Sequence, residues 1–515
     1  MATVLIQNLT AATTPLTGAE LIPLVQGGIT KQTAMTNALA QPYYAKTTAE
    51  NTAGVTPTNY AIPSHDATGF VNAKRYGAVG DGSTDSTTAL ANALLVAIGS
   101  NCPLYIPGAS SWYKSTSPLA VTASVQIVGG GSAETTIRFF NCDGIDISAS
   151  VNDVAIERME IFSVDGSGAA DPKTNIGIDV NGGSGTACNR IVTRDLYMRG
   201  WATCIDYSYT WTSRIDTVTM LNCTTGVRYF GQSVNDTISN SSISANSGSY
   251  CIRTVKDGAV KGEGLLVSNT LLASGTYGVS SDGFLFMRFS NCTIDLITDT
   301  AFDLTNVIDF GVHNSWIYAA NYGVFFRDLS VDVVQKASLS GNDIMVTDAN
   351  AKAVRIGAHN IGISITGGAL TSGPSGTGRC LYIDTLASDV SITGTYLANA
   401  GPNPSIFNAG SLFTYAALTG SFSLQNNTFP TIASATALPI PVVGDVFHVS
   451  GTTTITSATP SYQSGRRITL IFDGALTLTD GSNLRLAGNF VTTADDTITL
   501  VCDESYYYET SRSVN

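Results

Sequence analysis

The chain has 515 residues, of which 13% are charged, 43% are hydrophobic and 50 are glycine. This composition excludes a disordered chain or a helical bundle and is typical of an all-β protein with many tight turns. The formal net charge of −13 argues against nucleic-acid binding through a broad basic surface, because an acidic protein repels phosphate backbones.

The nine cysteines lie far apart and show no metal-knuckle spacing, and no calcium loop of regular acidic spacing is present. We therefore expect small buried cysteines in a chain that folds in a reducing compartment, with no metal and no cofactor. Neither a signal peptide nor an apolar stretch long enough to span a membrane is visible. We expect a soluble protein that does not insert into membranes.

Residues 1–65 differ in character from the rest of the chain. The segment from Leu16 to Lys31, LTGAELIPLVQGGITK, resembles the N-terminal attachment modules of bacteriophage tail fibres and tailspikes. Residues 47–65 are polar and are typical of a linker. The resemblance implies that residues 1–65 form a virion-attachment module that binds a phage tail or adaptor protein.

Residues 71–90 are turn-rich and contain the glycine-rich segment Gly80-Asp-Gly82. Asp85 or Ser86 can cap a following helix. The next apolar residues have helical spacing, and they are Ala89, Leu90, Ala93, Leu94 and Ala97. This pattern predicts a short helix that covers the first coil of a repeat structure.

A six-residue pattern, apolar, any, turn residue, any, any, apolar, recurs ten times. The segments begin at Ile156, Thr193, Ile215, Ile238, Val267, Phe289, Val312, Leu339, Ile365 and Ile392, which are 22 to 37 residues apart. Eight of the ten third positions hold Asn, Asp or Gly, the residues that best tolerate left-handed backbone angles. The pattern therefore predicts about ten coils of a parallel β-solenoid between residues 66 and 430.

Three segments near the start of the repeat resemble the N-terminal signature of the pectate-lyase-like β-helix superfamily. They are residues 71–90 with their GDG and acidic-Thr run, Leu104 to Gly108 (LYIPG) and Val125 to Gly131 (VQIVGGG). The resemblance implies a right-handed parallel β-helix. It leaves the chemistry open, because the superfamily contains lyases, hydrolases and non-catalytic members.

Residues 431–515 are predicted to form a small β-sandwich-like domain. Alternating strands are expected at 444–450, 465–472 and 496–502, with Asp-Gly turns between them. This region resembles the C-terminal β-domain of many phage spike proteins, with a role in trimerisation or receptor binding. The three-part plan resembles a phage tailspike. It implies a homotrimer located in the virion tail and made without a signal peptide in the cytoplasm of the infected bacterium.

The coil register places charged residues of the first three coils close together. The candidate catalytic residues are Glu157, Asp216, Glu160 and Asp195. The candidate substrate-binding residues are Arg194, Tyr197, Trp201, Tyr207, Tyr209, Trp211, Arg214 and, on a later coil, Trp316. Most of the aromatic residues are expected in a loop between coils two and three, where their rings can stack on sugars.

Hydrolysis of a glycosidic bond needs two carboxyl groups ~5 to ~9.5 Å apart, and Glu157 and Asp216, two coils apart, fit the longer separation. One of them would need a raised pKa to act as the acid. In the alternative interpretation, Arg194 simply neutralises these two stacked neighbours in a surface ion network.

Other locations for the chemistry stay open. The residues His313, Trp316 and Asp343 form a second candidate site, and a groove between subunits is a third. An elimination reaction would need a base and a cation, for which Lys256, Lys261 and Arg288 are candidates.

We predict a tailspike that binds and depolymerises a bacterial surface polysaccharide such as capsule, exopolysaccharide or lipopolysaccharide O-antigen, with hydrolysis favoured over elimination. The alternative is a non-enzymatic receptor-binding tail fibre with the same fold. The phage-like N-terminal module argues against a cellular pectinase-like enzyme.

Overall fold

A computed structural model of the chain describes residues 21–26, 29–34 and 69–515, apart from 170–173, 329–334, 374–376, 400–402, 421–422, 427–430, 442–444 and 460–463. Strands β1 (Leu21–Gln26) and β2 (Ile29–Ala34) pair antiparallel. The rest of the predicted attachment module and linker, residues 1–65, lies outside the described residues.

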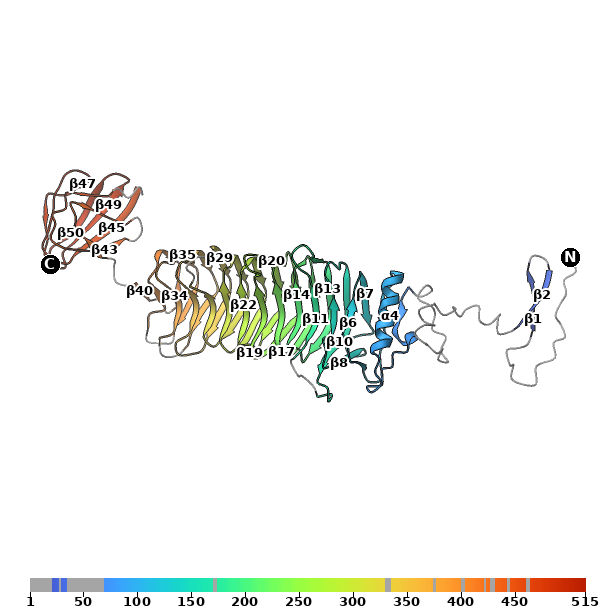
Figure 1. The fold of residues 1–515 in the computed structure, drawn as a ribbon. Helices are drawn as coiled ribbons and strands as arrows, with labels where there is room; N and C mark the ends of the chain where they lie inside the picture. The colour runs from blue at the N-terminus through green and yellow to red at the C-terminus, as the bar shows by residue number, and fades with distance from the viewer. Residues whose placement is uncertain are drawn as a thin grey trace.

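Between Val71 and Asn426 the chain winds as a parallel β-solenoid with three columns of strands (Figure 1). The first column contains β3 (Val71–Asn72), β4 (Leu104–Ile106), β7 (Val125–Gly129), the first parts of β10 (Val154–Val164) and β13 (Ile191–Arg199), β16 (Arg214–Asp216), β18 (Thr237–Ser239), β20 (Gly262–Ser268), β23 (Phe284–Ser290), β26 (Ile308–His313), β29 (Gln335–Ser340), β32 (Ile361–Thr366), β35 (Ser388–Thr393) and β38 (Ser411–Ala416).

The second column contains β5 (Tyr113–Ser115), β8 (Thr136–Phe140), the ends of β10 and β13, the starts of β17 (Thr219–Phe230) and β19 (Ser242–Val255), β21 (Leu271–Ala273), β24 (Thr293–Ile297), β27 (Trp316–Ala319), β30 (Asp343–Val346), β33 (Ala369–Ser372), β36 (Tyr396–Asn399) and β39 (Thr419–Gly420).

The third column contains β6 (Leu119–Val121), β9 (Ile145–Ile147), β11 (Ile176–Asn181), β14 (Thr203–Ser208), the ends of β17 and β19, β22 (Tyr277–Asp282), β25 (Thr300–Thr305), β28 (Tyr322–Phe326), β31 (Lys352–Ile356), β34 (Arg379–Ile383), β37 (Ile406–Asn408) and β40 (Leu424–Asn426).

The fold class is the predicted one, but about ten coils is too low a number. The first column alone contains 14 paired strands, from β3 to β38. The six-residue pattern missed β3, β4 and β7 at the start of the column and β38 at its end. In β4 and β7 the residues after the strand depart from the pattern, and β38 is followed by Ala417 at the corner instead of Asn or Gly.

The predicted corner is confirmed at all ten positions. Each third residue of the pattern has a left-handed φ between +49° and +66°, including non-glycine residues such as Arg158 and Thr217. Because each corner fixes the register of the strands beside it, Glu157 pairs with Arg194 and Arg194 with Asp216, as predicted. The corner stack therefore aligns the first two columns along the whole solenoid.

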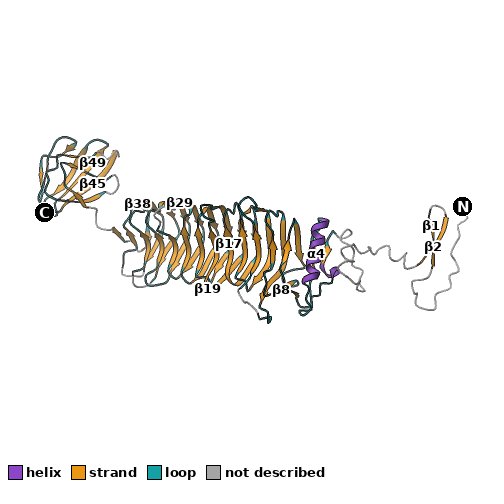
Figure 2. Cartoon of the chain, viewed as in Figure 1, coloured by secondary structure: helices purple, strands orange, loops and turns teal. Residues whose placement is uncertain are grey.

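The predicted capping helix is confirmed as α4 (Thr87–Ser100), which follows the short 3-10 helix η1 (Ala73–Tyr76). Its buried face consists of Leu90, Ala93, Leu94 and Ala97. Asp85 accepts a hydrogen bond from the backbone N–H of Thr87 at 2.9 Å. Figure 2 shows this helix at the N-terminal end of the coils, with strands dominating the rest of the described chain.

The solenoid interior is one apolar core that runs from Val71 to Ile406. Seven of the nine cysteines are buried, and all nine are free, as expected for small core residues. Within the described residues, no helix is long and apolar enough to cross a membrane. The strands thus form a rigid support whose outward side chains define the faces.

Residues 431–515 contain a second apolar core, which includes Phe447 and Phe472. Its main sheet has the order β41 (Thr431–Ala433), β43 (Val446–Ser450), β45 (Ser464–Phe472), β49 (Thr497–Asp503), β50 (Tyr507–Ser513) and β47 (Leu484–Arg485). Two smaller pairs join β42 (Ala437–Leu438) to β44 (Ser457–Ala458) and β46 (Thr477–Leu478) to β48 (Phe490–Val491). A further pair, β12 (Cys188–Asn189) with β15 (Thr210–Trp211), lies on the solenoid. The strands predicted at 444–450, 465–472 and 496–502 correspond to β43, β45 and β49.

Candidate functional site

The predicted carboxylate pair on the first column is tied into a hydrogen-bonded network. Arg194 Nη2 lies 2.9 Å from Glu157 Oε2, and the Glu157 side chain is only 8% exposed. Asp216 accepts hydrogen bonds from the Ser239 hydroxyl at 2.7 Å and from the Asn240 amide at 2.9 Å. These bonds, Ser239 first, lower the pKa of Asp216. Asp216 is therefore held as an anion, which fits the ion-network interpretation and is the wrong direction for a catalytic acid.

The other two predicted carboxylates lie beside this network. Glu160 accepts a hydrogen bond from the Thr136 hydroxyl at 2.6 Å. Asp195 is exposed at the left-handed corner and, with Tyr197 and Arg158, lines an open hollow of about 400 Å³. The structure thus brings Asp195 and Tyr197 together at the surface, where their assignment to substrate binding or catalysis stays a prediction.

The expected aromatic loop between coils two and three is wrong. The segment forms strands β14 and β15, and Trp201 and Tyr207 are fully buried. Trp201 Nε1 donates to the Ile161 carbonyl oxygen at 3.2 Å, while Tyr207 packs against Tyr229. Because both rings face the core, neither can stack on a sugar.

Of the four other predicted contact residues, three lie at the surface. The fourth, Tyr209, is buried, and its hydroxyl donates to Asp257 at 2.7 Å. Trp211 and Trp316 are 41% and 43% exposed, and Arg214 is exposed as well. These last three remain accessible to a ligand.

The second candidate site is only partly supported. Trp316 and Asp343 are register partners on neighbouring coils, as predicted. Burial, and then the charge of Arg288, lower the pKa of His313, so His313 is neutral at neutral pH. Arg288 itself is paired with Asp309.

The other two candidate bases for elimination are Lys256 and Lys261. Lys256 pairs with Asp282 at 3.3 Å. Lys261 immediately precedes β20. None of these contacts assigns a catalytic role.

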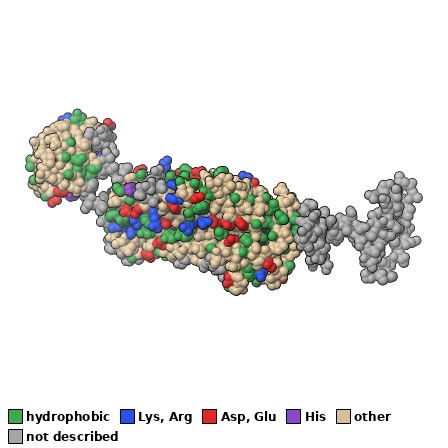
Figure 3. Space-filling model, in the orientation of Figure 1, with side chains coloured by type: hydrophobic (Ala, Val, Ile, Leu, Met, Phe, Trp, Pro, Cys, Tyr) green, Lys and Arg blue, Asp and Glu red, His purple; other side chains and the backbone are tan. Residues whose placement is uncertain are grey.

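A second row of outward side chains, on the third column, was missed by the sequence interpretation. We call it the third-face band, and its members in coil order are Asp146, Asp179, Asp206, Arg228, Arg253, Ser280, Asp303, Phe325, Arg355, Tyr382 and Phe407. Figure 3 shows acidic and basic side chains gathered along the solenoid on the face turned toward the viewer.

A repeat in the sequence does mark this row: a small residue, an apolar residue, the outward residue and usually another apolar residue. Examples are Gly177-Ile-Asp-Val180, Gly226-Val-Arg-Tyr229 and Ala353-Val-Arg-Ile356. The small residue is required because coils touch there. A Cβ on Gly226 would lie 2.5 Å from the Cys251 carbonyl oxygen.

Three stacked aspartates begin the band, and we call them the acidic stack: Asp146, Asp179 and Asp206. Burial first, and then the charges of Asp206 and Asp146, raise the pKa of Asp179 to about 6. Asp206 is 1% exposed and receives two contacts from Arg228, at 2.9 and 2.6 Å. Asn181 donates a hydrogen bond to Asp146.

This arrangement places a carboxyl group with a raised pKa between two other carboxyl groups. At neutral pH a minor fraction of Asp179 is protonated, and this fraction grows as the pH falls toward 6. Burial also raises the pKa of Asp206, although its ion pair with Arg228 favours the anion. Neighbouring coils are ~4.8 Å apart. A carboxyl group with a raised pKa and a second carboxyl group at such a spacing are the requirement for acid-assisted glycosidic cleavage.

Flat and charged groups continue along the same face. Tyr250 and Tyr277 stack with ring centroids 5.2 Å apart, and Arg253 lies over Tyr250. Arg327 pairs with Asp303 at 2.5 Å. Burial lowers the pKa of Arg327, but the ion pair with Asp303 outweighs burial, so the pKa is raised above its ordinary value. Rings and guanidinium groups suit the apolar faces and hydroxyls of sugars. Among the described residues, no group of three His, Cys, Asp or Glu side chains is arranged to hold a metal ion.

Comparisons with known proteins agree on the fold. A family model described as rhamnogalacturonase A/epimerase, pectate lyase-like, matches residues 70–150, the part that contains the predicted signature. No curated protein matches the chain.

Two solved structures are similar to the solenoid. The catalytic unit of a thermostable GH87 α-1,3-glucanase from Streptomyces thermodiastaticus has a TM-score of 0.52 at 12% identity, covering 72% of this chain and 71% of that chain. The Agl-KA catalytic domain has a TM-score of 0.50 at 16% identity, covering 72% of this chain and 70% of that chain. The chain therefore has the pectate-lyase-like right-handed β-helix fold, which it shares with a glycan-acting enzyme.

Proposed function

We propose that this protein binds a bacterial surface polysaccharide along the third-face band and hydrolyses it at the acidic stack. The observation that carries the proposal is the position of Asp179, a carboxyl group with a pKa of about 6 between two other aspartates, at the end of a band of aromatic and guanidinium groups. Sharing a fold with an α-1,3-glucanase supports carbohydrate processing.

In the proposed reaction, Asp179 donates its proton to the glycosidic oxygen as that bond to the anomeric carbon breaks. Asp146, one coil away, attacks the anomeric carbon as that bond breaks and forms a glycosyl ester, which a water molecule, losing a proton to Asp179, then hydrolyses. Asp206, held by Arg228, keeps a negative charge beside Asp179 and so maintains its affinity for the proton.

The biological setting of this activity is part of the same proposal. The resemblance of Leu16 to Lys31 to phage attachment modules supports a tailspike that binds tail or adaptor proteins through residues 1–65. We propose a homotrimer in the virion tail, made in the cytoplasm of the infected bacterium, that adsorbs the phage to its host.

The test is cleavage of purified capsule or lipopolysaccharide, measured as released reducing ends. Asp179→Asn should lose at least a hundredfold in rate, the low end of what general acid catalysis contributes (~10²–10⁴), and should keep binding. Asp216→Asn, in the first-column network, is the matched control and should retain cleavage.

The reverse result, cleavage lost in Asp216→Asn and kept in Asp179→Asn, would move the active site to the first-column cluster. A product with the ultraviolet absorption of an unsaturated uronate would replace hydrolysis by elimination.

A non-enzymatic receptor-binding fibre is the second candidate. It is favoured by the partners that the acidic stack already has, namely Arg228 on Asp206 and Asn181 on Asp146. Binding of the polysaccharide without any release of oligosaccharides would select this function over hydrolysis.

A further inference from the structure

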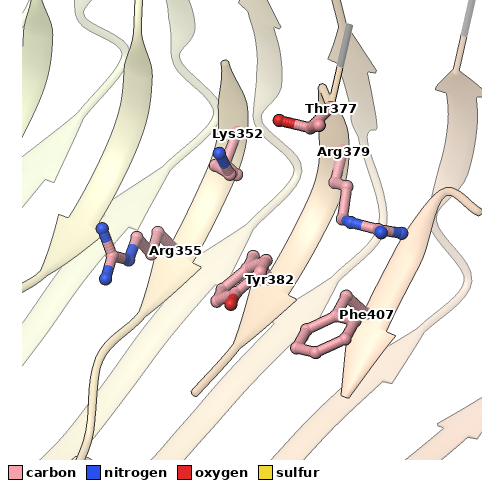
Figure 4. Close-up of a pocket in the computed structure, with 6 residues that line it drawn as sticks. All are labelled: Lys352, Arg355, Thr377, Arg379, Tyr382 and Phe407. Carbon is pink, nitrogen blue, oxygen red and sulfur yellow. The ribbon is translucent and has the colours of Figure 1, made fainter. Parts of the chain in front are cut away.

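A cationic pocket lies on the third face, far along the coils from the acidic stack. It is a hollow of about 360 Å³ lined by Lys352, Arg355, Thr377, Arg379, Tyr382 and Phe407. Figure 4 shows Arg355, Tyr382 and Phe407 in one row on successive strands, with Lys352 and Arg379 beside it. The register explains both rows, because Lys352 pairs with Arg379, and Tyr382 with Arg355 and Phe407.

The floor of the pocket is aromatic. The rings of Tyr382 and Phe407 stack with centroids 4.7 Å apart and planes inclined by 19°. Cations lie over both rings, with Lys352 Nζ 5.7 Å from the Tyr382 centroid and the Arg379 guanidinium 5.1 Å from that of Phe407. These contacts hold the cations of the pocket against the aromatic pair.

The walls carry more positive than negative charge. Arg355 is paired with Asp384 at 3.0 Å and, more loosely, with Asp328 at 3.7 Å. Lys352 forms no ion pair with a described carboxylate, and its ammonium donates only to the Asn350 carbonyl oxygen. Arg379 is 8% exposed and donates to the Pro404 carbonyl oxygen.

Like charges held together with restricted solvent access disfavour one another. Burial, followed by the charges of Arg355 and Arg379, lowers the pKa of Lys352, and burial lowers that of Arg379. An anion placed in the pocket would relieve both effects, since it would pair with cations that are already desolvated and positioned.

We propose that this cationic pocket binds the carboxylate of an acidic sugar residue, so that the polysaccharide bound along the third-face band is an acidic one. This inference rests on the proposed function and names its substrate class. The pocket lies six coils from Asp206, roughly 29 Å at ~4.8 Å per coil, so both sites would be occupied by one extended polymer. Because the whole chain has a net charge of −13, general attraction cannot explain binding of a polyanion.

The experiment measures binding of polygalacturonate, hyaluronan and neutral dextran to the full chain carrying Asp179→Asn, which is designed not to cut them. We expect at least one acidic polymer to bind tenfold or more tightly than dextran. Adding Lys352→Gln should weaken that binding at least tenfold. Arg485→Gln, which removes one exposed positive charge in the C-terminal domain, is the matched control and should change it less than twofold.

Equal binding of dextran, or unchanged binding after Lys352→Gln, would overturn the proposal. Competition separates the anion sources, because free glucuronate should displace the polymer whereas inorganic phosphate should not. If phosphate displaces it equally well, the carboxylate assignment is overturned.

The outcome is independent of the proposed hydrolysis, which is measured on the chain with Asp179 intact. An acidic polymer that is bound through Lys352 but never cut would refute the proposed hydrolysis and still support anion binding in the cationic pocket. A neutral polymer that is cut would support the proposed hydrolysis and refute the acidic substrate class.

Discussion

Asp236 is a buried carboxyl group whose environment favours the protonated form. Its side chain is 1% exposed and accepts hydrogen bonds from the Ser213 N–H at 2.7 Å and the Thr210 hydroxyl at 2.6 Å. Burial outweighs these bonds and raises the pKa of Asp236 to about 8. The stability that this group contributes is fully present below its unfolded-state pKa of ~3.9 and is lost as pH rises through about 8.

Asp236→Asn should therefore remove a pH-dependent cost of the folded state. The asparagine oxygen can still accept from Ser213, and its amide can donate to Thr210. We expect the melting temperature of the variant, relative to that of the wild type, to rise steadily between pH 5 and pH 8.

Melting curves at a fixed scan rate across this pH range make the comparison. Asp389→Asn changes an exposed carboxylate and serves as the control, with a difference that varies less with pH. A constant difference for Asp236→Asn would show that its carboxyl group does not change protonation in the folded protein.

For single residues, the sequence did not indicate which side chains are buried. Trp201 and Tyr207 belong to a residue class that often binds sugars, but Trp201, between β13 and β14, and Tyr207, in β14, both face the core. Their orientation depends on how many residues separate β13 from β14, and no local pattern sets that number. The role of Asp179 was missed for the same reason, since its raised pKa comes first from burial and then from the aspartates at positions 206 and 146 on neighbouring coils.

Among the elements, the corners were predictable because the backbone conformation of a corner depends on the residue at that one position. A sharp bend between the first two columns requires one left-handed residue, and Asn or Gly supplies it most easily, as at Asn291 and Gly367. Two apolar residues beside each corner then fix the register. Columns one and two, and with them the pairing of Glu157, Arg194 and Asp216, follow from sequence alone.

The third column was not predicted from the sequence because the segments that lead into and out of it vary in length between coils. Its only constant feature is the small residue that precedes each buried apolar one. Gly226 shows why that residue is small: a Cβ there would lie 2.2 Å from Ile243 Cγ2 and 2.5 Å from the Cys251 carbonyl oxygen.

Gly226→Ala should destabilise the solenoid by about 1–3 kcal/mol, the usual cost of overpacking a core, because the neighbouring coil would have to move. Gly99→Ala in α4 is the matched control. Its added Cβ meets nothing within 4 Å, and alanine suits a helix better by ~0.5–1 kcal/mol. Thermal unfolding of both variants tests the pair, and equal stability of Gly226→Ala and the wild type would contradict the close contact between coils.

On the scale of the whole molecule, the chain has two separate apolar cores. One fills the solenoid from Val71 to Ile406, and the other lies between Ile432 and Tyr507. A solenoid is stabilised by contacts between neighbouring coils, so its core is continuous along the stack. The C-terminal core is instead enclosed by its own mixed sheet and does not depend on that stacking.

Two cores that do not share side chains should unfold as two units. We expect calorimetry of the full chain to show a large transition for the solenoid and a smaller one for residues 431–515. Truncating a buried phenylalanine costs about 3–5 kcal/mol, and that loss should reach only the core that contains it. Phe447→Ala should lower the smaller transition alone, and Phe302→Ala, also fully buried, should lower the larger one alone. If either variant shifts both transitions together, the C-terminal core is coupled to the coils and the two-unit description fails.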